Sequence, residues 1–161
     1  MASFNGTMMQ AHMPPPVTPW STGICDCLDD RQNCVYTCFC PCFTYGMVAE
    51  IVDRGATSGS ASAVLYGFVA SVTGCLMHWM YSCFNRNKMR AQYGLHGNPL
   101  LDGLAHCAME PCALCQEYRE LKNRGFVVEI GWQANMERRH QQYQQQQGVT
   151  VPPAMDNGMI R

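Results

Sequence analysis

Two groups of closely spaced cysteines carry the clearest chemical signal in this chain. The segment Cys38-Phe39-Cys40-Pro41-Cys42 places three thiols within five residues, and Cys34 lies one helical turn upstream. A second group further along contains a Cys-x-x-Cys pair, a common half of a tetrahedral zinc site. Closely spaced thiolates can share Zn or Cd, because the loop between them closes at little entropic cost. The candidate metal ligands are Cys34, Cys38, Cys40, Cys42, Cys107, Cys112 and Cys115.

The spacing of these thiols leaves two other readings open. They could be structural or acylated cysteines facing protein or lipid, or the Cys-x-x-Cys pair could be redox-active. The chain has 161 residues and eleven cysteines, an odd number that excludes full internal pairing. Residues 1–20 show no basic or apolar region typical of a signal peptide, so a disulfide framework is not expected. Any Zn or Cd is expected to bind transiently, and no permanent cofactor is predicted.

Composition points toward lipid and away from nucleic acid. The net charge is −1, and charged residues make up only 14% of the chain. A balanced charge gives no reason to expect a nucleic-acid partner. Ordinary soluble domains carry about 25% charged residues, so the shortage favours a membrane protein.

The chain is predicted to be a small, mainly helical, cysteine-rich membrane protein with about three helices. We expect the helices at 41–54, 61–93 and 101–124, followed by a short strand or an extended segment at 126–130. The ordered domain spans 20–132, between a disordered Met- and Pro-rich start (1–19) and a disordered Gln-rich tail (133–161).

Two uncharged segments are candidates for the hydrophobic part of the domain. Residues 62–84 hold 23 positions without Asp, Glu, Lys or Arg, enough for a transmembrane helix, although a buried helix of a soluble bundle would look similar. Residues 35–49 are uncharged but short, and could form a hairpin with the 62–84 segment. Arg86, Lys88 and Arg90 follow the longer segment and are expected to face the cytoplasm, together with the C-terminus.

Several polar residues could serve a cation path. Cys75, His78 and Cys83 lie in or beside the longer apolar segment, where an ionisable residue is a functional candidate. The acidic candidates are Glu50, Asp53, Glu110 and Glu117, although helical pairs such as Glu50 with Arg54 and Glu120 with Arg124 explain two acids more simply. No paired carboxylates, Ser-His-Asp set or phosphate loop is present, so no enzyme activity is expected.

Several segments resemble the plant cadmium-resistance and cell-number-regulator (fruit-weight) proteins, part of a larger cysteine-rich family named after a placenta-specific protein. They are WSTGICDC (20–27), CPCFTYG (40–46), AEIVDRG (49–55) and CALCQEYRELKNRGF (112–126), closed by Gly131-Trp132. The family's hallmark is a Cys-Cys pair, four residues, then Cys-Pro-Cys. In this chain Val35 replaces its second cysteine.

The resemblance implies an integral plasma-membrane protein, a homo-oligomer, with a role in cadmium and zinc resistance or in restraining cell number. We therefore predict a membrane protein for heavy-metal resistance or divalent-cation transport. The alternatives are a membrane-anchored regulator of cell number and organ size that transports nothing, and a peripheral zinc-binding domain.

Overall fold

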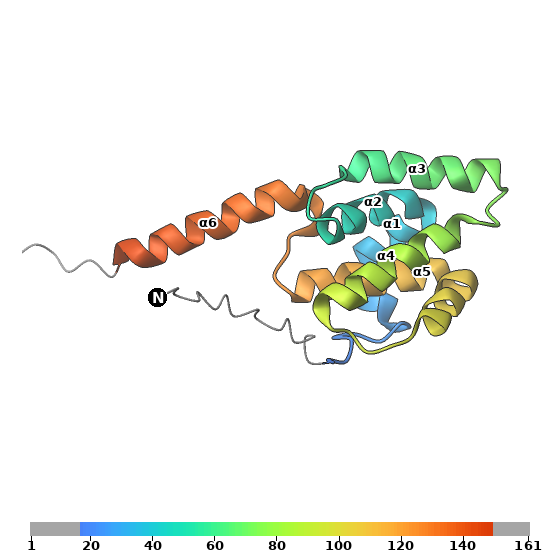
Figure 1. Ribbon diagram of the computed structural model, residues 1–161, viewed down its shortest axis with the longest axis horizontal. Helices are drawn as coiled ribbons and strands as arrows, with labels where there is room; N and C mark the ends of the chain where they lie inside the picture. The colour runs from blue at the N-terminus through green and yellow to red at the C-terminus, as the bar shows by residue number, and fades with distance from the viewer. Residues whose placement is uncertain (1–16, 150–161) are drawn as a thin grey trace, which may run out of the picture.

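A computed structural model describes the backbone of residues 17–149 and the side chains of residues 17–146. The prediction of a mainly helical chain is confirmed, since no strand occurs in that range (Figure 1). The elements run in the order η1 (Asp26–Asp30), α1 (Arg31–Phe39), α2 (Pro41–Val52), α3 (Gly59–Val72), α4 (His78–Tyr93), α5 (Pro99–Asn123), η2 (Val128–Ile130) and α6 (Gly131–Val149).

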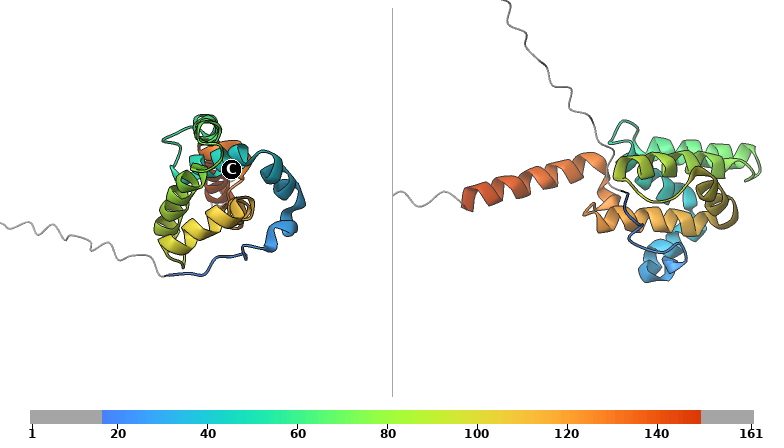
Figure 2. Two further views of the ribbon diagram at one scale, coloured as in Figure 1. Left: turned by 90° about the vertical axis from the view of Figure 1, so that its right-hand side faces the viewer. Right: turned by 60° about the horizontal axis from the view of Figure 1, so that its bottom comes forward.

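Helix α2 lies at the centre of the bundle, with the other helices of the domain around it. Its buried face, including Val48 and Ile51, joins Met89 of α4 and Leu121 of α5 in the main apolar core. The η1–α1 segment packs against α2 and α5 on the side away from α4 (Figure 2). Helix α5 therefore contacts both the N-terminal cysteine segment and α4, which makes it the element that positions most polar side chains.

The expected number of helices is wrong. The described range contains six α-helices: the segment 61–93 divides into α3 and α4 at a turn after Val72, and α1 and α6 lie outside the three predicted segments. At that turn Gly74 and Cys75 both adopt positive φ, a conformation that ends a helix. Of the two alternatives for 126–130, the strand is wrong: Val127 is extended, but Val128–Ile130 form a 3-10 turn.

The predictions of disorder for the two chain ends compare differently with the structure. The start predicted to be disordered, 1–19, lies outside the described residues except for 17–19, where Thr18 bridges to Leu95. The Gln-rich segment expected to be disordered from residue 133 is helical in α6 as far as Val149. Residues 150–161 lie outside the description.

No single helix between residues 17 and 149 has the length and hydropathy to cross a bilayer. The segment Asp26–Phe39 and helix Pro41–Val52 meet those criteria only when taken together, and they are bent by 112° to each other. The 62–84 segment predicted to span is thus two shorter elements, so this prediction of a single long apolar helix is wrong.

Helix boundaries follow ordinary capping chemistry. Asn98 caps α5 by accepting hydrogen bonds from the amides of Leu100 and Leu101, with Pro99 in the first turn. Within α5, Met109 has non-helical dihedrals and the helix kinks there. Pro111 explains the kink, because it has no amide hydrogen to donate and its ring crowds the preceding turn.

Close packing of α2 on α3 gives a first testable prediction. A Cβ atom added at Gly46 would lie 2.8 Å from the Cβ of Ala63 and closer still to the Gly59 carbonyl oxygen. At Gly67 of α3, the nearest atom to an added Cβ is 4.0 Å away. We expect Gly46→Ala to lower the free energy of unfolding by about 1–3 kcal/mol through overpacking, and Gly67→Ala to raise it by about 0.5–1 kcal/mol through helix propensity. Urea unfolding of both variants measures the difference, and equal effects would contradict the close approach.

Candidate functional site

Four thiols from three separate segments converge on one side of the bundle. Cys27 comes from η1, Cys34 from α1, and Cys112 and Cys115 from α5. The Sγ atoms of Cys27 and Cys112 lie 4.0 Å apart, and Cys34 also contacts Cys27. Cys115 is buried beside them, close enough for its charge to affect Cys34. We call these four residues the inner thiol cluster.

Burial and neighbouring groups keep three thiols of the inner thiol cluster, Cys34, Cys112 and Cys115, protonated in the free protein. Partial burial, followed by the neighbouring Cys27 thiol, raises the pKa of Cys34 to about 12 and that of Cys112 to about 11. Burial also raises the pKa of Cys115, against the opposing effects of the Thr37 hydroxyl and the Arg119 guanidinium. A thiol must lose its proton to ligate a metal, so binding here would release protons.

One sulfur–sulfur distance in the cluster matches that of a tetrahedral sulfur site, although the four thiols do not yet form such a site. Zinc–sulfur bonds of about 2.3 Å in a tetrahedron place the sulfur atoms about 3.8 Å apart. The separation of 4.0 Å between Cys27 and Cys112 is close to this value. In residues 17–149, no three His, Cys, Asp or Glu side chains are already arranged to hold a metal ion. Binding would therefore need movements that draw the remaining thiols together.

The other thiols predicted as ligands lie elsewhere. Cys40 and Cys42 form a separate pair at the junction of α1 and α2, with their Sγ atoms 3.3 Å apart. Cys38 is exposed on α1, close enough to the inner thiol cluster to influence Cys34 and Cys115. Cys107 is exposed on the first half of α5.

A second polar centre lies buried between α4 and α5. The Arg86 guanidinium, 4% exposed, bonds to Asp102 at 2.9 Å, to Gln116 at 2.6 Å and to Glu117 at 3.4 Å. Arg90 also reaches Asp102 at 2.6 Å. Arg86 and Arg90 therefore point into the protein, although the sequence suggested a basic flank beside a membrane span.

His106 joins two of the predicted acidic residues. Its Nδ1 lies 3.1 Å from Glu110 Oε2 and its Nε2 lies 3.0 Å from Glu117 Oε1. Tyr66 and Ser82 donate hydrogen bonds to the other oxygen of Glu110. With both ring nitrogens facing carboxylates, the imidazole is held as a cation, and the centre balances three cations against three carboxylates. These are Arg86, Arg90 and His106 against Asp102, Glu110 and Glu117.

The remaining predicted polar residues have separate surroundings. Glu50 does not pair with Arg54; it accepts hydrogen bonds from the amides of Gly59 and Trp132 and so ties α3 and α6 to α2. Asp53 pairs with Lys88 at 2.9 Å. The pair between Glu120 and Arg124 is confirmed, with a distance of 2.7 Å.

Cys75, His78 and Cys83 are not gathered into one site. Cys75 is exposed in the turn between α3 and α4. The ring of His78 meets Tyr66 edge-on at 5.4 Å, which places it beside the buried charged centre. Cys83 is half-buried near the Pro99 carbonyl oxygen.

The charged centre gives a prediction about pH. Burial alone would lower the pKa of His106, but its hydrogen bonds to Glu110 and Glu117 raise that pKa from 6.5 to about 9. Because the pKa is higher in the folded than in the unfolded protein, protonation of His106 stabilises the fold, and this stabilisation is complete below pH 6.5. It is lost as the pH rises through 9 and the imidazole loses its proton. We expect a loss on the order of 3 kcal/mol across this range. An NMR titration of the imidazole measures the midpoint directly, and a midpoint at or below 6.5 would contradict the arrangement.

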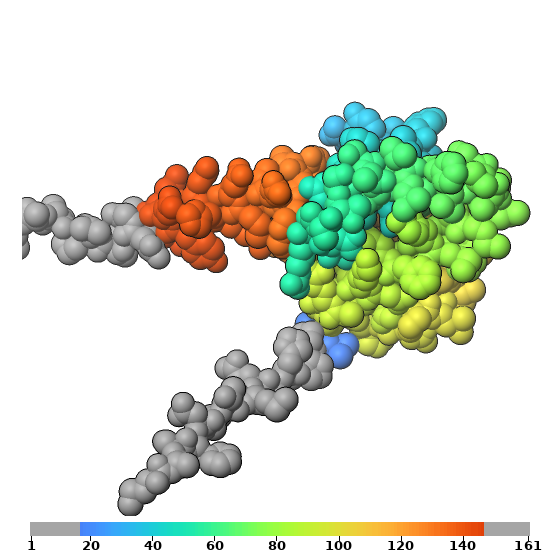
Figure 3. Space-filling model, turned by 45° about the horizontal axis from the view of Figure 1, so that its top comes forward, coloured from blue at the N-terminus to red at the C-terminus, as the bar shows by residue number. Residues whose placement is uncertain are grey.

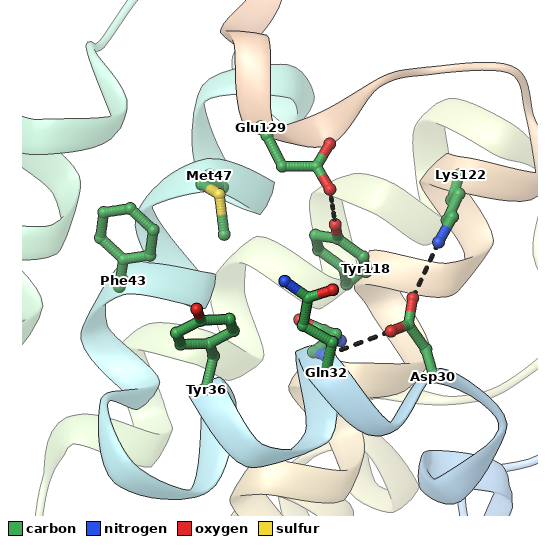
Figure 4. A pocket seen from close by; sticks show the side chains of 9 residues that line it. Asp30, Gln32, Tyr36, Phe43, Met47, Tyr118, Lys122 and Glu129 are labelled. Atoms are coloured by element: carbon green, nitrogen blue, oxygen red, sulfur yellow. Dashed lines mark hydrogen bonds and ion pairs between the residues drawn. The ribbon is translucent and has the colours of Figure 1, made fainter.

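A pocket of about 230 Å³ lies between α1, α2, α5 and η2 (Figure 4). Its apolar side is formed by Tyr36, Phe43 and Met47. On its polar side Lys122 pairs with Asp30 at 2.8 Å and the Tyr118 hydroxyl donates to Glu129. The ion pair of Asp30 with Lys122 links the end of η1 to the end of α5, and so helps to hold η1, which carries Cys27, against α5.

Sequence reasoning missed Cys27 as a member of the cluster and missed His106, Arg86 and Asp102 in the charged centre. Cys27 lies in a short 3-10 helix far from α5 in sequence, so no spacing rule could pair it with Cys112. His106 could have been found, because Glu110 and Glu117 follow it at intervals of four and eleven residues, which share one helical face.

Comparisons with known proteins identify the family of this chain. Residues 20–120 match the model of the PLAC8 family. The protein PLANT CADMIUM RESISTANCE 2 of Arabidopsis thaliana is 50% identical over 143 residues, covering 88% of this chain and 90% of the relative. Cell number regulator 10 of Zea mays is 54% identical over 122 residues, covering 76% of each chain, and cell number regulator 1 of Zea mays is 50% identical over 149 residues, covering 88% and 74%. No solved structure matches this chain. The family match spans the region that holds both the inner thiol cluster and the buried charged centre, and the chain belongs to the PLAC8 family.

Proposed function

We propose that this protein binds soft divalent metal ions, with Cd and Zn as cargo, and contributes to heavy-metal resistance. The observation that carries the proposal is the convergence of Cys27, Cys34 and the Cys112–Cys115 pair from three segments. Sulfur ligands prefer Cd and Zn to hard ions such as Ca and Mg. The name of the Arabidopsis relative, which refers to cadmium resistance, supports the same ion class.

Binding and release would both be possible at such a cluster. A preformed cage of four thiolates would hold its ion tightly, whereas protonated thiols that must move would bind more weakly. Weak binding suits a protein that passes an ion on, as cation transport requires. We therefore favour a handling or transport role over permanent storage.

We also propose that the protein acts at a membrane. Helix α3, the start of α4 and the start of α5 expose large apolar side chains, and no charged residue occurs between positions 54 and 86. Exposed apolar surfaces of this extent mark sites of membrane or protein interaction. The exposed side chains are Val64, Leu65, Phe68, Val72, Leu76, Met77, Met80, Phe84, Leu100, Leu101 and Leu104.

Cadmium tolerance in a cadmium-sensitive yeast tests the proposed function. Wild type and a Cys27→Ser/Cys112→Ser variant would be expressed at equal abundance, with Cys75→Ser as a control that removes an exposed thiol outside the cluster. Wild type and the control should protect growth on cadmium, and the cluster variant should not. Protection by the cluster variant equal to wild type would refute the metal-handling proposal.

Metal affinity should rise with pH. The thiols of Cys34 and Cys112 have raised pKa values, so each bound ion must displace their protons at neutral pH. Affinity for cadmium should therefore increase by about tenfold per pH unit for each thiol that the ion deprotonates. Competition titrations with a chelator between about pH 6 and pH 8 measure this slope. An affinity independent of pH would exclude protonated thiols as the ligands.

A second candidate function is the regulation of cell number without transport. The two maize relatives, both named as cell number regulators, favour it. In that case plants with altered gene dosage should change in cell count while their tissue cadmium and zinc contents stay constant. A change in metal content that tracks dosage would favour the first function.

A further inference from the structure

The junction of α1 and α2 carries two thiols that lie apart from the inner thiol cluster. Cys40 occupies the corner itself, after the last residue of α1 and before Pro41, where the two segments meet at 112°. The Cys40 side chain is exposed, and Cys42 lies 3.3 Å from it, sulfur to sulfur. The corner therefore presents a free thiol at a projecting point of the surface.

The surroundings of Cys40 are apolar and poor in further metal ligands. No Asp, Glu, His, Lys or Arg occurs between positions 31 and 50. From α1 and α2, the only further thiols are Cys38, which is exposed, and Cys34, which belongs to the inner thiol cluster. Phe39, immediately before Cys40, is 88% exposed, and Val35 and Phe43 are more than half exposed. Exposed apolar side chains gathered beside a thiol mark a site of membrane or protein interaction.

This corner continues into the apolar surface of α3. An added Cβ at Gly67 would meet Cys42 first, so the middle of α3 lies against the corner. From there α3 exposes Phe68 and Val72, and Figure 3 shows this helix lying on the surface beside α4. The Cys40 thiol thus lies in one segment without Asp, Glu, Lys or Arg (32–49) and beside another (55–85), which is the setting of membrane-proximal acylated cysteines.

We propose that Cys40 is an S-acylation site whose long-chain acyl group enters the lipid leaflet that covers the apolar surface of α3. Cys42 is close enough to serve as a second acceptor. The proposal rests on the membrane association proposed above, and it is independent of metal binding by the inner thiol cluster. It divides the cysteines by role: the cluster on η1, α1 and α5 binds the ion, and the corner pair anchors the protein.

The acylation step balances without an oxidant or a reductant. The Cys40 thiolate attacks the thioester carbonyl of a long-chain acyl-CoA, presented by an acyltransferase of the membrane. The carbon–sulfur bond to coenzyme A breaks as the new carbon–sulfur bond forms. Coenzyme A leaves as a thiol, taking up the proton that Cys40 lost.

A single acyl chain gives only marginal and reversible membrane binding, and a second apolar or charged signal makes the anchoring stable. The apolar surface of α3 and α4 supplies that second signal in this protein. Loss of the acyl chain should consequently weaken membrane association while leaving the protein folded, since the Cys40 side chain is exposed and its hydrogen-bond partner is the neighbouring thiol of Cys42.

The test is metabolic labelling with an alkynyl fatty acid in plant cells that express the tagged full chain. Wild type should carry a label that hydroxylamine removes, as expected for a thioester. Cys40→Ser/Cys42→Ser should lose the label, whereas Cys27→Ser/Cys112→Ser should keep it. Circular dichroism of each purified variant checks the fold, and mass spectrometry of wild-type peptides locates the acyl group without any variant.

Fractionation of the same cells separates this proposal from the membrane proposal. A wild-type protein found in the membrane fraction without a hydroxylamine-sensitive label would overturn acylation and leave membrane association standing. A label that persists in the Cys40→Ser/Cys42→Ser variant, or an acyl group mapped to another cysteine, would also overturn it. Loss of the label in that variant, with the acyl group mapped to Cys40, is the expected result.

Discussion

Replacing His106 with leucine should destabilise the protein by about 3–5 kcal/mol, because it removes one partner of a buried ionic network. The imidazole is 1% exposed and bridges Glu110 and Glu117. Without it, two buried carboxylates would face each other across an apolar side chain. Urea unfolding monitored by circular dichroism measures the loss.

Two further variants identify the cause of that loss. His96 is exposed, and its backbone alone bonds to Thr18 and Trp20, so His96→Leu should change stability by less than about 0.5 kcal/mol. Adding Glu110→Gln to His106→Leu removes one of the stranded charges and should recover part of the stability. If His106→Leu is no less stable than His96→Leu, the buried centre does not hold α5 as described.

Removing Cys27 and Cys112 together should weaken cadmium binding by at least about a hundredfold, because half of the thiol ligands would be lost. These two sulfur atoms lie 4.0 Å apart and come from segments 85 residues apart in sequence. Serine at both positions keeps the size of the side chain while removing the soft ligand. Competition titration of the purified protein with a chelator measures the affinity.

The matched control removes the same number of thiols from the corner. Cys40→Ser/Cys42→Ser should bind cadmium as wild type does, since the corner pair lies outside the inner thiol cluster. The opposite pattern, with affinity lost in the corner variant and kept in the cluster variant, would return the metal site to the Cys-Pro-Cys segment singled out from the sequence.

The sequence was sufficient to predict a helical chain and the helices near 41–54 and 101–124. Their boundaries follow from local signals, such as Pro41 at the start of α2 and Asn98 before α5. The break at Gly74 and Cys75 was missed because an uncharged run of 23 residues reads as one helix when only hydropathy is considered. The arrangement of the six helices depends on such turns, and the periodicity of apolar residues does not reveal them.

The site could be predicted only in part. Cys34, Cys112 and Cys115 were identified from spacing, because helical intervals place thiols on one face. The contribution of Cys27 depends on how η1 packs on α5, a tertiary contact fixed in part by the ion pair of Asp30 with Lys122. Likewise, Arg86 was assigned to a membrane flank from its neighbours in sequence, whereas its burial depends on Asp102 across the helix interface.

X-ray absorption at the zinc edge, on the purified protein loaded with zinc, tests the central claim most directly. Coordination by the inner thiol cluster predicts a shell of sulfur neighbours at about 2.3 Å, dominated by thiolates. A shell composed only of nitrogen and oxygen at about 2.0–2.2 Å would contradict it. Such a shell would move the ion away from Cys27, Cys34, Cys112 and Cys115.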